Sequence, residues 1–230
     1  TVVVSGVYVL IAPVFNVVYP RFSALVATSE TEKLIDLYRL GTRMLASVLF
    51  PVAMVLAVFA EDLVLVWTGN PSVASNVAPV ISLLVTRSAL NGVMYFPYAL
   101  QLAYGKTWIP LTINVVLMLF LIPLIIYLAW TYGALGGAMA WLIAEVVYVI
   151  FGPWLTHRNI LKGLWAKWII QDVGMPFALS IVMGAVGYYA VQGAGYSPYE
   201  KIMAAFGLAI LTSALTLLMT RQVRDAVRNY

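Results

Sequence analysis

The chain has 230 residues, of which 63% are hydrophobic and only 10% are charged, and its net charge is +4. A soluble domain is typically about 45–50% apolar and about 25% charged, so one small core could not bury this much apolar surface. The apolar runs are about 20 residues long, which fits spanning helices rather than the short alternating strands of a membrane barrel. We therefore expect an all-α membrane protein, a polytopic helical bundle.

Several classes of function are disfavoured. The basic residues cluster at the ends of apolar segments, where they orient a membrane protein, so the positive charge does not indicate nucleic acid as a partner. The sequence has no cysteine and a single histidine, His157, which argues against disulfides, a metal centre and a catalytic triad. It also lacks a Walker loop, a His-Glu-x-x-His motif and a nucleophile elbow. We expect no enzyme activity, no cofactor and no metal.

In chain order, seven apolar segments are long enough to be read as spans. Their approximate ranges are 1–19, 40–60, 73–104, 108–130, 132–154, 173–191 and 202–220. The first span looks truncated, and the chain begins at Thr1 without a methionine. We therefore expect a C-terminal piece of a larger protein whose N-terminal bundle is missing.

The connections between these spans also carry local signals. Residues 20–39 are polar, and residues 29–32 resemble a helix start that leads into an apolar side on the membrane surface or into the next span. Arg43, near the beginning of the second span, is expected to snorkel to the interface. The small residues at 133–138 should permit close backbone contact with a neighbouring helix. Residues 156–172 are basic and amphipathic, which predicts a helix lying in the interface plane.

Lys and Arg are distributed unequally between the connections. They are plentiful in residues 20–39, in residues 156–172 and in a basic C-terminal tail, and absent from residues 61–72 and 131–132. The positive-inside rule then places the C-terminus in the cytoplasm and Thr1 on the far side. The basic residues of the tail are Arg221, Arg224 and Arg228.

The segment 73–104 carries the most informative polar residue, Arg87, near its middle. A charge at that depth costs at least about 2.5–3.5 kcal/mol on insertion scales, so it normally faces protein or water. At helical spacing it shares a face with polar or aromatic residues, which are Asn76, Asn91, Tyr95 and Tyr98. Arg87 either pairs with a carbonyl or carboxylate inside the bundle or lines a polar pathway.

Glu145 is the only other ionisable residue deep in an apolar segment. It could pair with Arg87, because opposite charges on separate helices relieve each other's desolvation. The two could instead flank a hydrated cavity, with Arg87 facing an anionic substrate and Glu145 a coupling cation, or they could pack independently. Asn16 lies on the less apolar face of the first span. Our candidates for a substrate pathway are Arg87, Asn91, Glu145, Tyr95, Tyr98 and Asn16.

Several short motifs are informative through their combined order and spacing. They are Tyr19-Pro20-Arg21-Phe22-Ser23-Ala24-Leu25, Glu32-Lys33-Leu34, Tyr38, Pro51, residues 59–69, residues 100–107 and residues 133–138. In these motifs the chain resembles the polysaccharide-exporting branch of the multidrug/oligosaccharidyl-lipid/polysaccharide flippase superfamily, in particular its Wzx-like O-antigen flippases.

The resemblance implies roughly fourteen spans in two pseudo-symmetric bundles, of which the seven here would be the C-terminal half. It implies a multi-pass protein of the bacterial or archaeal inner membrane. Such proteins flip undecaprenyl-pyrophosphate-linked oligosaccharides by alternating access. Arg residues that face the cavity would hold the pyrophosphate, a role for which the planar donors of Arg87 are suited. The implied partners are the lipid-linked oligosaccharide, the bilayer and the missing N-terminal half.

Three other functions are also considered. A cation-coupled multidrug or small-molecule exporter of the same superfamily would use Glu145 to couple transport to H⁺ or Na⁺. A membrane glycosyltransferase or polymerase is disfavoured, because there are no paired acidic residues in the membrane and no long soluble loop. In a scaffold, Arg87 and Glu145 would form only a structural pair.

Overall fold

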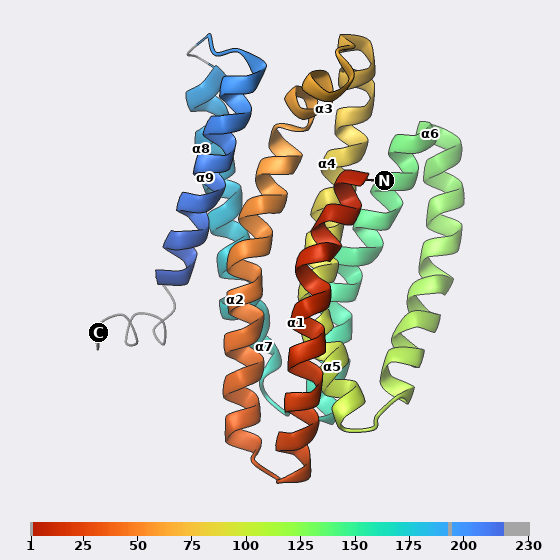
Figure 1. The fold of residues 1–230 in the computed structure, drawn as a ribbon. Coiled ribbons are helices and arrows are strands. Elements are labelled where there is room, and N and C mark those ends of the chain that lie inside the picture. The colour runs from red at the N-terminus through yellow and green to blue at the C-terminus, as the bar shows by residue number, and fades with distance from the viewer. Residues whose placement is uncertain (1, 193–194, 219–230) are drawn as a thin grey trace.

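The computed structural model describes residues 2–192 and 195–218, and within these it omits the side chains of residues 2–10, 12 and 192. The described chain is helical and contains no strand, which confirms the expected all-α polytopic helical bundle (Figure 1). The basic tail with Arg221, Arg224 and Arg228 lies outside the described residues.

The chain forms long helices joined by short connections. A π-helical segment, η1, continues directly into α8. The elements are α1 (Val2–Ala27), α2 (Thr31–Val58), α3 (Ala60–Thr68), α4 (Pro71–Val93), α5 (Tyr95–Ala103), α6 (Trp108–Asn159), α7 (Trp165–Lys167), η1 (Trp168–Gly174), α8 (Met175–Gln192) and α9 (Pro198–Leu218).

Within the described residues, five helical stretches are long and apolar enough to cross a membrane. They are Thr31–Val58, Pro71–Ala103, Trp108–Asn159, Trp165–Val191 and Pro198–Leu218. The count of seven spans remains a prediction. The length of the third stretch, 52 residues, is explained by a turn within it.

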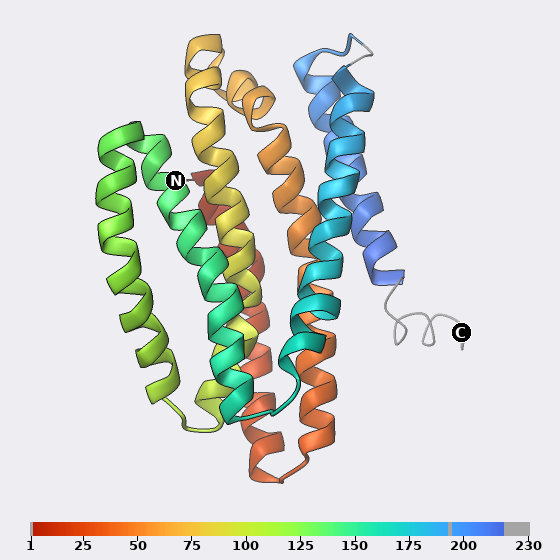
Figure 2. The ribbon, with the colours of Figure 1, turned by 180° about the vertical axis from the view of Figure 1, so that it is seen from behind.

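α6 is a helical hairpin rather than one straight helix. Its backbone reverses at Gly133, where φ is 60° and ψ is −136°, a conformation that favours glycine. The two arms then run side by side in opposite directions (Figures 1 and 2). A Cβ on Gly136 would overlap the carbonyl oxygen of Leu128, so the arms touch backbone to backbone. The predicted close contact of residues 133–138 is therefore made with the preceding arm of the same helix.

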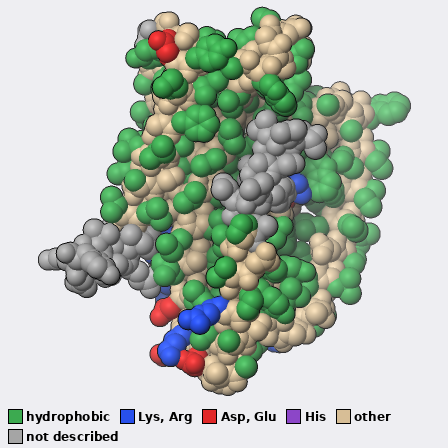
Figure 3. All heavy atoms as spheres, in the orientation of Figure 1, with side chains coloured by type: hydrophobic (Ala, Val, Ile, Leu, Met, Phe, Trp, Pro, Cys, Tyr) green, Lys and Arg blue, Asp and Glu red, His purple; other side chains and the backbone are tan. Residues whose placement is uncertain are grey.

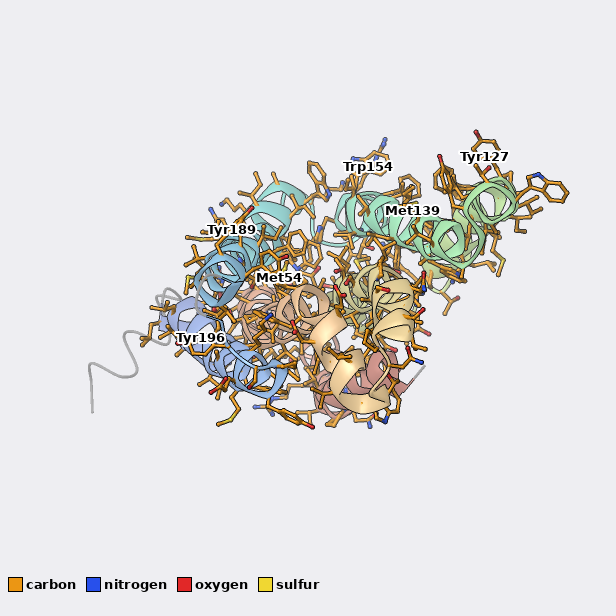
Figure 4. All side chains as sticks on the ribbon, turned by 90° about the horizontal axis from the view of Figure 1, so that it is seen from above. Met54, Tyr127, Met139, Trp154, Tyr189 and Tyr196 are labelled. Carbon is orange, nitrogen blue, oxygen red and sulfur yellow. The ribbon has the colours of Figure 1, made fainter. Side chains whose placement is uncertain are left out.

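The first arm of α6 stands at the edge of the bundle (Figure 2). Its apolar side chains are highly exposed, with Leu119 71% and Trp130 92% accessible. Seen along the bundle, Tyr127 on this arm points away from all other helices (Figure 4). Much of the visible surface between the two ends is hydrophobic in the same way (Figure 3). Lipid would solvate this surface in a membrane.

α2 is the central helix and packs against α1, α4, α8 and α9. It begins at Thr31 and continues without interruption through Pro51 to Val58. The polar stretch 20–39 therefore leads directly into the second span. This is one of the two alternatives that the sequence left open, the other being a helix side on the membrane surface. Gly92 of α4 lies so close to α2 and α1 that a Cβ would meet the side chains of Leu49 and Ile11.

The predicted span 73–104 corresponds to the apolar stretch Pro71–Ala103. This stretch is divided into α4 and α5 at Met94, because Pro97 has no N–H to donate to the carbonyl of Val93. The predicted interfacial helix at 156–172 is wrong. Its first residues end α6, a turn through Gly163 follows, and the rest begins α7 and η1. The apolar side of that stretch, including the fully buried Trp168, packs into the protein core instead of lipid.

The connections lie alternately at two ends of the bundle. The α1–α2, α5–α6 and α6–α7 connections lie together at the lower end in Figure 1, whereas α3 and the turn of α6 lie at the upper end. We call the lower end the basic end, because its connections and flanking turns carry Lys33, Lys106, Arg158 and Lys162. Charged side chains gather at that end in Figure 3.

We predict that Gly136→Ala destabilises the protein and that Gly137→Ala does not. The Gly136 methyl group would push the two arms of α6 apart, at a cost of about 1–3 kcal/mol for an overpacked contact. The Gly137 methyl group would meet nothing within 4 Å. Thermal unfolding in detergent checks this pair, and equal melting temperatures for the two variants would contradict the hairpin contact.

Candidate functional site

Arg87 and Glu145 face each other between α4 and the second arm of α6. Arg87 Nε lies 3.4 Å from Glu145 Oε2. The Glu145 side chain is 5% exposed, whereas that of Arg87 is 22% exposed. The carboxylate is therefore enclosed, and the arginine side chain is partly exposed. The sequence left open an ion pair, a shared hydrated cavity or independent packing, and in the structure the two residues form an ion pair.

Two further side chains contact the ion pair. Asn91 Nδ2, one turn along α4 from Arg87, donates a hydrogen bond of 3.0 Å to Glu145 Oε1. The Arg87 guanidinium lies 4.6 Å from the ring centroid of Trp141, one turn before Glu145 on α6. A cation over an aromatic face gains about 0.5–2 kcal/mol, depending on solvent exposure. We call Arg87, Asn91, Trp141 and Glu145 the midspan cluster.

The charges of the midspan cluster balance, which makes it tolerable between spanning helices. Each isolated charge would cost several kcal/mol there, and the pair removes most of that cost. The two charges are not equivalent, however. Glu145 is held by an amide and a guanidinium, while Arg87 keeps part of its surface outside the protein interior. The arginine is therefore the less enclosed partner of the pair.

The remaining predicted residues form a separate aromatic group or stand alone. The Phe15 ring lies 5.7 Å from that of Tyr95 and 6.0 Å from that of Tyr98, joining α1 to α5. Tyr98 is 37% exposed and Asn16 on α1 is also exposed. The structure thus brings Arg87, Asn91 and Glu145 together and places Tyr95 and Tyr98 against Phe15.

Sequence reasoning missed a second charged cluster, which lies towards the basic end. Asp172 in η1 is completely buried and accepts hydrogen bonds from two arginines of α2. Arg39 Nε donates to Oδ2 at 2.8 Å, and Arg43 Nε donates to Oδ1 at 3.0 Å. Arg39 Nη2 also donates to Gln171 Oε1 at 2.9 Å. We call Arg39, Arg43 and Asp172 the clamp, because they fix α2 to η1.

The expectation that Arg43 snorkels to the interface is wrong. Its side chain is 23% exposed and paired, because a buried carboxylate lies within its reach. The available signal was Asp172 itself, an acidic residue at the end of a basic amphipathic stretch. No sequence pattern indicates that residues about 130 positions apart would meet.

Tyr38 connects α2, which carries the two arginines of the clamp, to the end of α6. A 2.9 Å hydrogen bond joins its hydroxyl to His157 Nε2, and its ring stacks on Trp168 with centroids 6.1 Å apart. Trp168 Nε1 in turn donates to Thr42 Oγ1 at 3.1 Å. The single histidine is therefore part of a buried polar and aromatic network. Among the residues the structure describes, no three His, Cys, Asp or Glu side chains are placed to hold a metal ion.

Comparison with known proteins gives one match. The family model described as "Polysaccharide biosynthesis protein" matches residues 2–75, which cover α1, α2, α3 and the start of α4. No curated protein and no solved structure matches the chain. Over these residues the chain is similar to polysaccharide biosynthesis proteins. The match includes Arg39 and Arg43 of the clamp and ends before the midspan cluster.

We predict that Asp172→Asn destabilises the fold strongly. The variant leaves two guanidiniums without a counter-charge, and removing one partner of a buried pair typically costs about 3–5 kcal/mol. Asp36→Asn, which alters an exposed aspartate on the same α2 helix, is the matched control. The melting temperature in detergent should fall for Asp172→Asn only. An unchanged melting temperature would show that the clamp adds nothing to stability.

Proposed function

We propose that the protein is part of a transporter that flips lipid-linked oligosaccharides across the inner membrane during polysaccharide biosynthesis. The observation that carries this proposal is the midspan cluster, in which a partly exposed arginine is held by an enclosed carboxylate between spanning helices. The apolar helical bundle and the polysaccharide biosynthesis match support it.

In this proposal Arg87 binds the pyrophosphate of an undecaprenyl-pyrophosphate-linked substrate. The guanidinium is planar and presents several donors, which suits two adjacent phosphates. Glu145 orients Arg87 in the absence of substrate and keeps its bond to Asn91 when a phosphate competes for the guanidinium. When the substrate is bound, Arg87 pairs with its phosphates. When the substrate leaves, Arg87 pairs with Glu145 again, so no unpaired charge remains in the membrane.

We infer an orientation in which the basic end and the C-terminus are cytoplasmic. The positive-inside rule supports it, because the basic connections share one end of the bundle. The midspan cluster would then lie between the two membrane faces, as alternating access requires. An N-terminal bundle would supply the opposite wall of the cavity. We propose no enzyme activity, so purified protein should transfer no sugar.

A cation-coupled exporter of the same superfamily is the second candidate, and the enclosure of Glu145 favours it. A carboxylate held by Asn91 could exchange its arginine partner for H⁺ or Na⁺. Transport that stops when both gradients are collapsed would favour this coupling. Transport that is indifferent to both gradients would exclude it.

We predict that the double variant Arg87→Gln/Glu145→Gln strongly reduces flipping while preserving protein abundance. Arg87→Ala alone would leave a buried carboxylate without its cation and so confound function with stability. Removing both charges avoids that problem. The loss of a charge-assisted hydrogen bond, about 1.5–3 kcal/mol, corresponds to a loss of substrate binding of about tenfold or more.

The measurement is translocation of lipid-linked oligosaccharide in proteoliposomes, or surface polysaccharide in cells, with abundance followed in parallel. The matched control is Asp62→Asn/Lys201→Gln, which removes an ion pair of 3.7 Å between α3 and α9. The control should flip normally. Normal flipping by the Arg87→Gln/Glu145→Gln variant would show that Arg87 and Glu145 have only a structural role.

A further inference from the structure

A third polar site lies on the outer surface of the bundle, away from the midspan cluster and the clamp. An open pocket of about 690 Å³ sits where the second arm of α6 ends and the chain turns into α7. Its walls include two tryptophans and two basic residues, together with a buried histidine and an amide. These are Trp154, Trp165, Arg158, Lys162, His157 and Asn159.

The tryptophan walls of the pocket are held in place by the protein. Trp165 Nε1 donates a 3.1 Å hydrogen bond to the carbonyl of Ile150, which ties α7 back to α6. The Arg158 guanidinium lies 5.4 Å from the ring centroid of Trp154, one turn before it on α6. Trp154 is 38% exposed and points outward from the bundle (Figure 4). Amphipathic rings of this kind favour the level of the lipid headgroups.

The charge of the pocket is positive. Arg158 and Lys162 are exposed, and no carboxylate is among the residues that line it. Lys106 adds a further positive charge nearby, since its Nζ donates at 2.6 Å to the carbonyl of Asn159. The nearest acidic residue along the chain, Asp172, is neutralised by Arg39 and Arg43.

We propose that this pocket binds the phosphate headgroup of an anionic membrane phospholipid. Basic pockets beside spanning helices at a cytoplasmic surface suit such headgroups, and the two tryptophans would contact the glycerol and upper acyl region. Because Trp154 points outward, the lipid would approach from the surrounding bilayer and not from the transport cavity. The site is thus independent of what the midspan cluster carries.

An alternative role for the basic residues at the end of α6 is to stabilise the helix dipole. This role predicts a different experimental result from lipid binding. A role limited to the dipole would change the stability of the protein and leave lipid selectivity unaltered. Lys167 is the matched control, because it lies in the same basic stretch but does not line the pocket.

The test is native mass spectrometry of the protein after exchange into an equimolar mixture of phosphatidylglycerol and phosphatidylcholine. The unmodified protein should retain phosphatidylglycerol preferentially. Arg158→Gln/Lys162→Gln should weaken that retention about twenty-five-fold, the effect expected for two basic residues at a membrane surface. Lys167→Gln should leave the preference unchanged, and Trp154→Leu should weaken retention with the positive charge intact.

Two results would overturn the proposal. The first is an undiminished phosphatidylglycerol preference in Arg158→Gln/Lys162→Gln, and a lower melting temperature beside it would indicate a dipole role only. The second is release of the bound lipid by inorganic phosphate as effectively as by added phosphatidylglycerol, which would indicate a site for soluble phosphates.

Discussion

Two enclosed carboxylates impose the main constraint on this fold. Asp172 is fully buried and Glu145 nearly so, and a charge in such surroundings is tolerated only with a partner. Each finds an arginine on another helix, so that the clamp joins α2 to η1 and the midspan cluster joins α4 to α6. Apolar packing is weakly specific between membrane helices, because lipid is as apolar as the side chains. The ionic contacts therefore help to fix which helices are neighbours.

The two clusters differ in balance, and this difference suits them to different tasks. The clamp has two guanidiniums around one carboxylate and is surrounded by the Tyr38, His157 and Trp168 network. The midspan cluster has one charge of each sign and a more exposed arginine. The first arrangement fixes helices to one another. In the proposed function, the second offers its cation to an anion while Asn91 keeps its hydrogen bond to Glu145. The pocket at Trp154 adds a third polar region, where α6 ends and the chain turns into α7.

The sequence was informative where a single residue conflicted with its surroundings. Arg87 and Glu145 stand out in apolar segments, and their pairing could be anticipated from the cost of isolated charges. The reversal at Gly133 lies beside the predicted boundary between two spans, because glycine permits the positive φ required. The clamp could not be predicted, since Asp172 and Arg39 are far apart in the chain and each looks interfacial. The interfacial helix at 156–172 was predicted wrongly for a related reason: an amphipathic pattern does not distinguish lipid from a protein core as the partner of its apolar side.

In the proposed transporter, the face of α4 that bears Arg87 opens onto water within the membrane. Because the chain has no cysteine, one introduced thiol can report on this directly. Leu84, one turn from Arg87 on the same face, would be replaced by cysteine, and Leu119→Cys on the exposed first arm of α6 would report on lipid. The measurement is labelling by a water-soluble maleimide in intact membranes. A water-filled cavity beside Arg87 predicts labelling of Leu84→Cys and protection of Leu119→Cys, whereas equal protection of both would show that no such cavity is present.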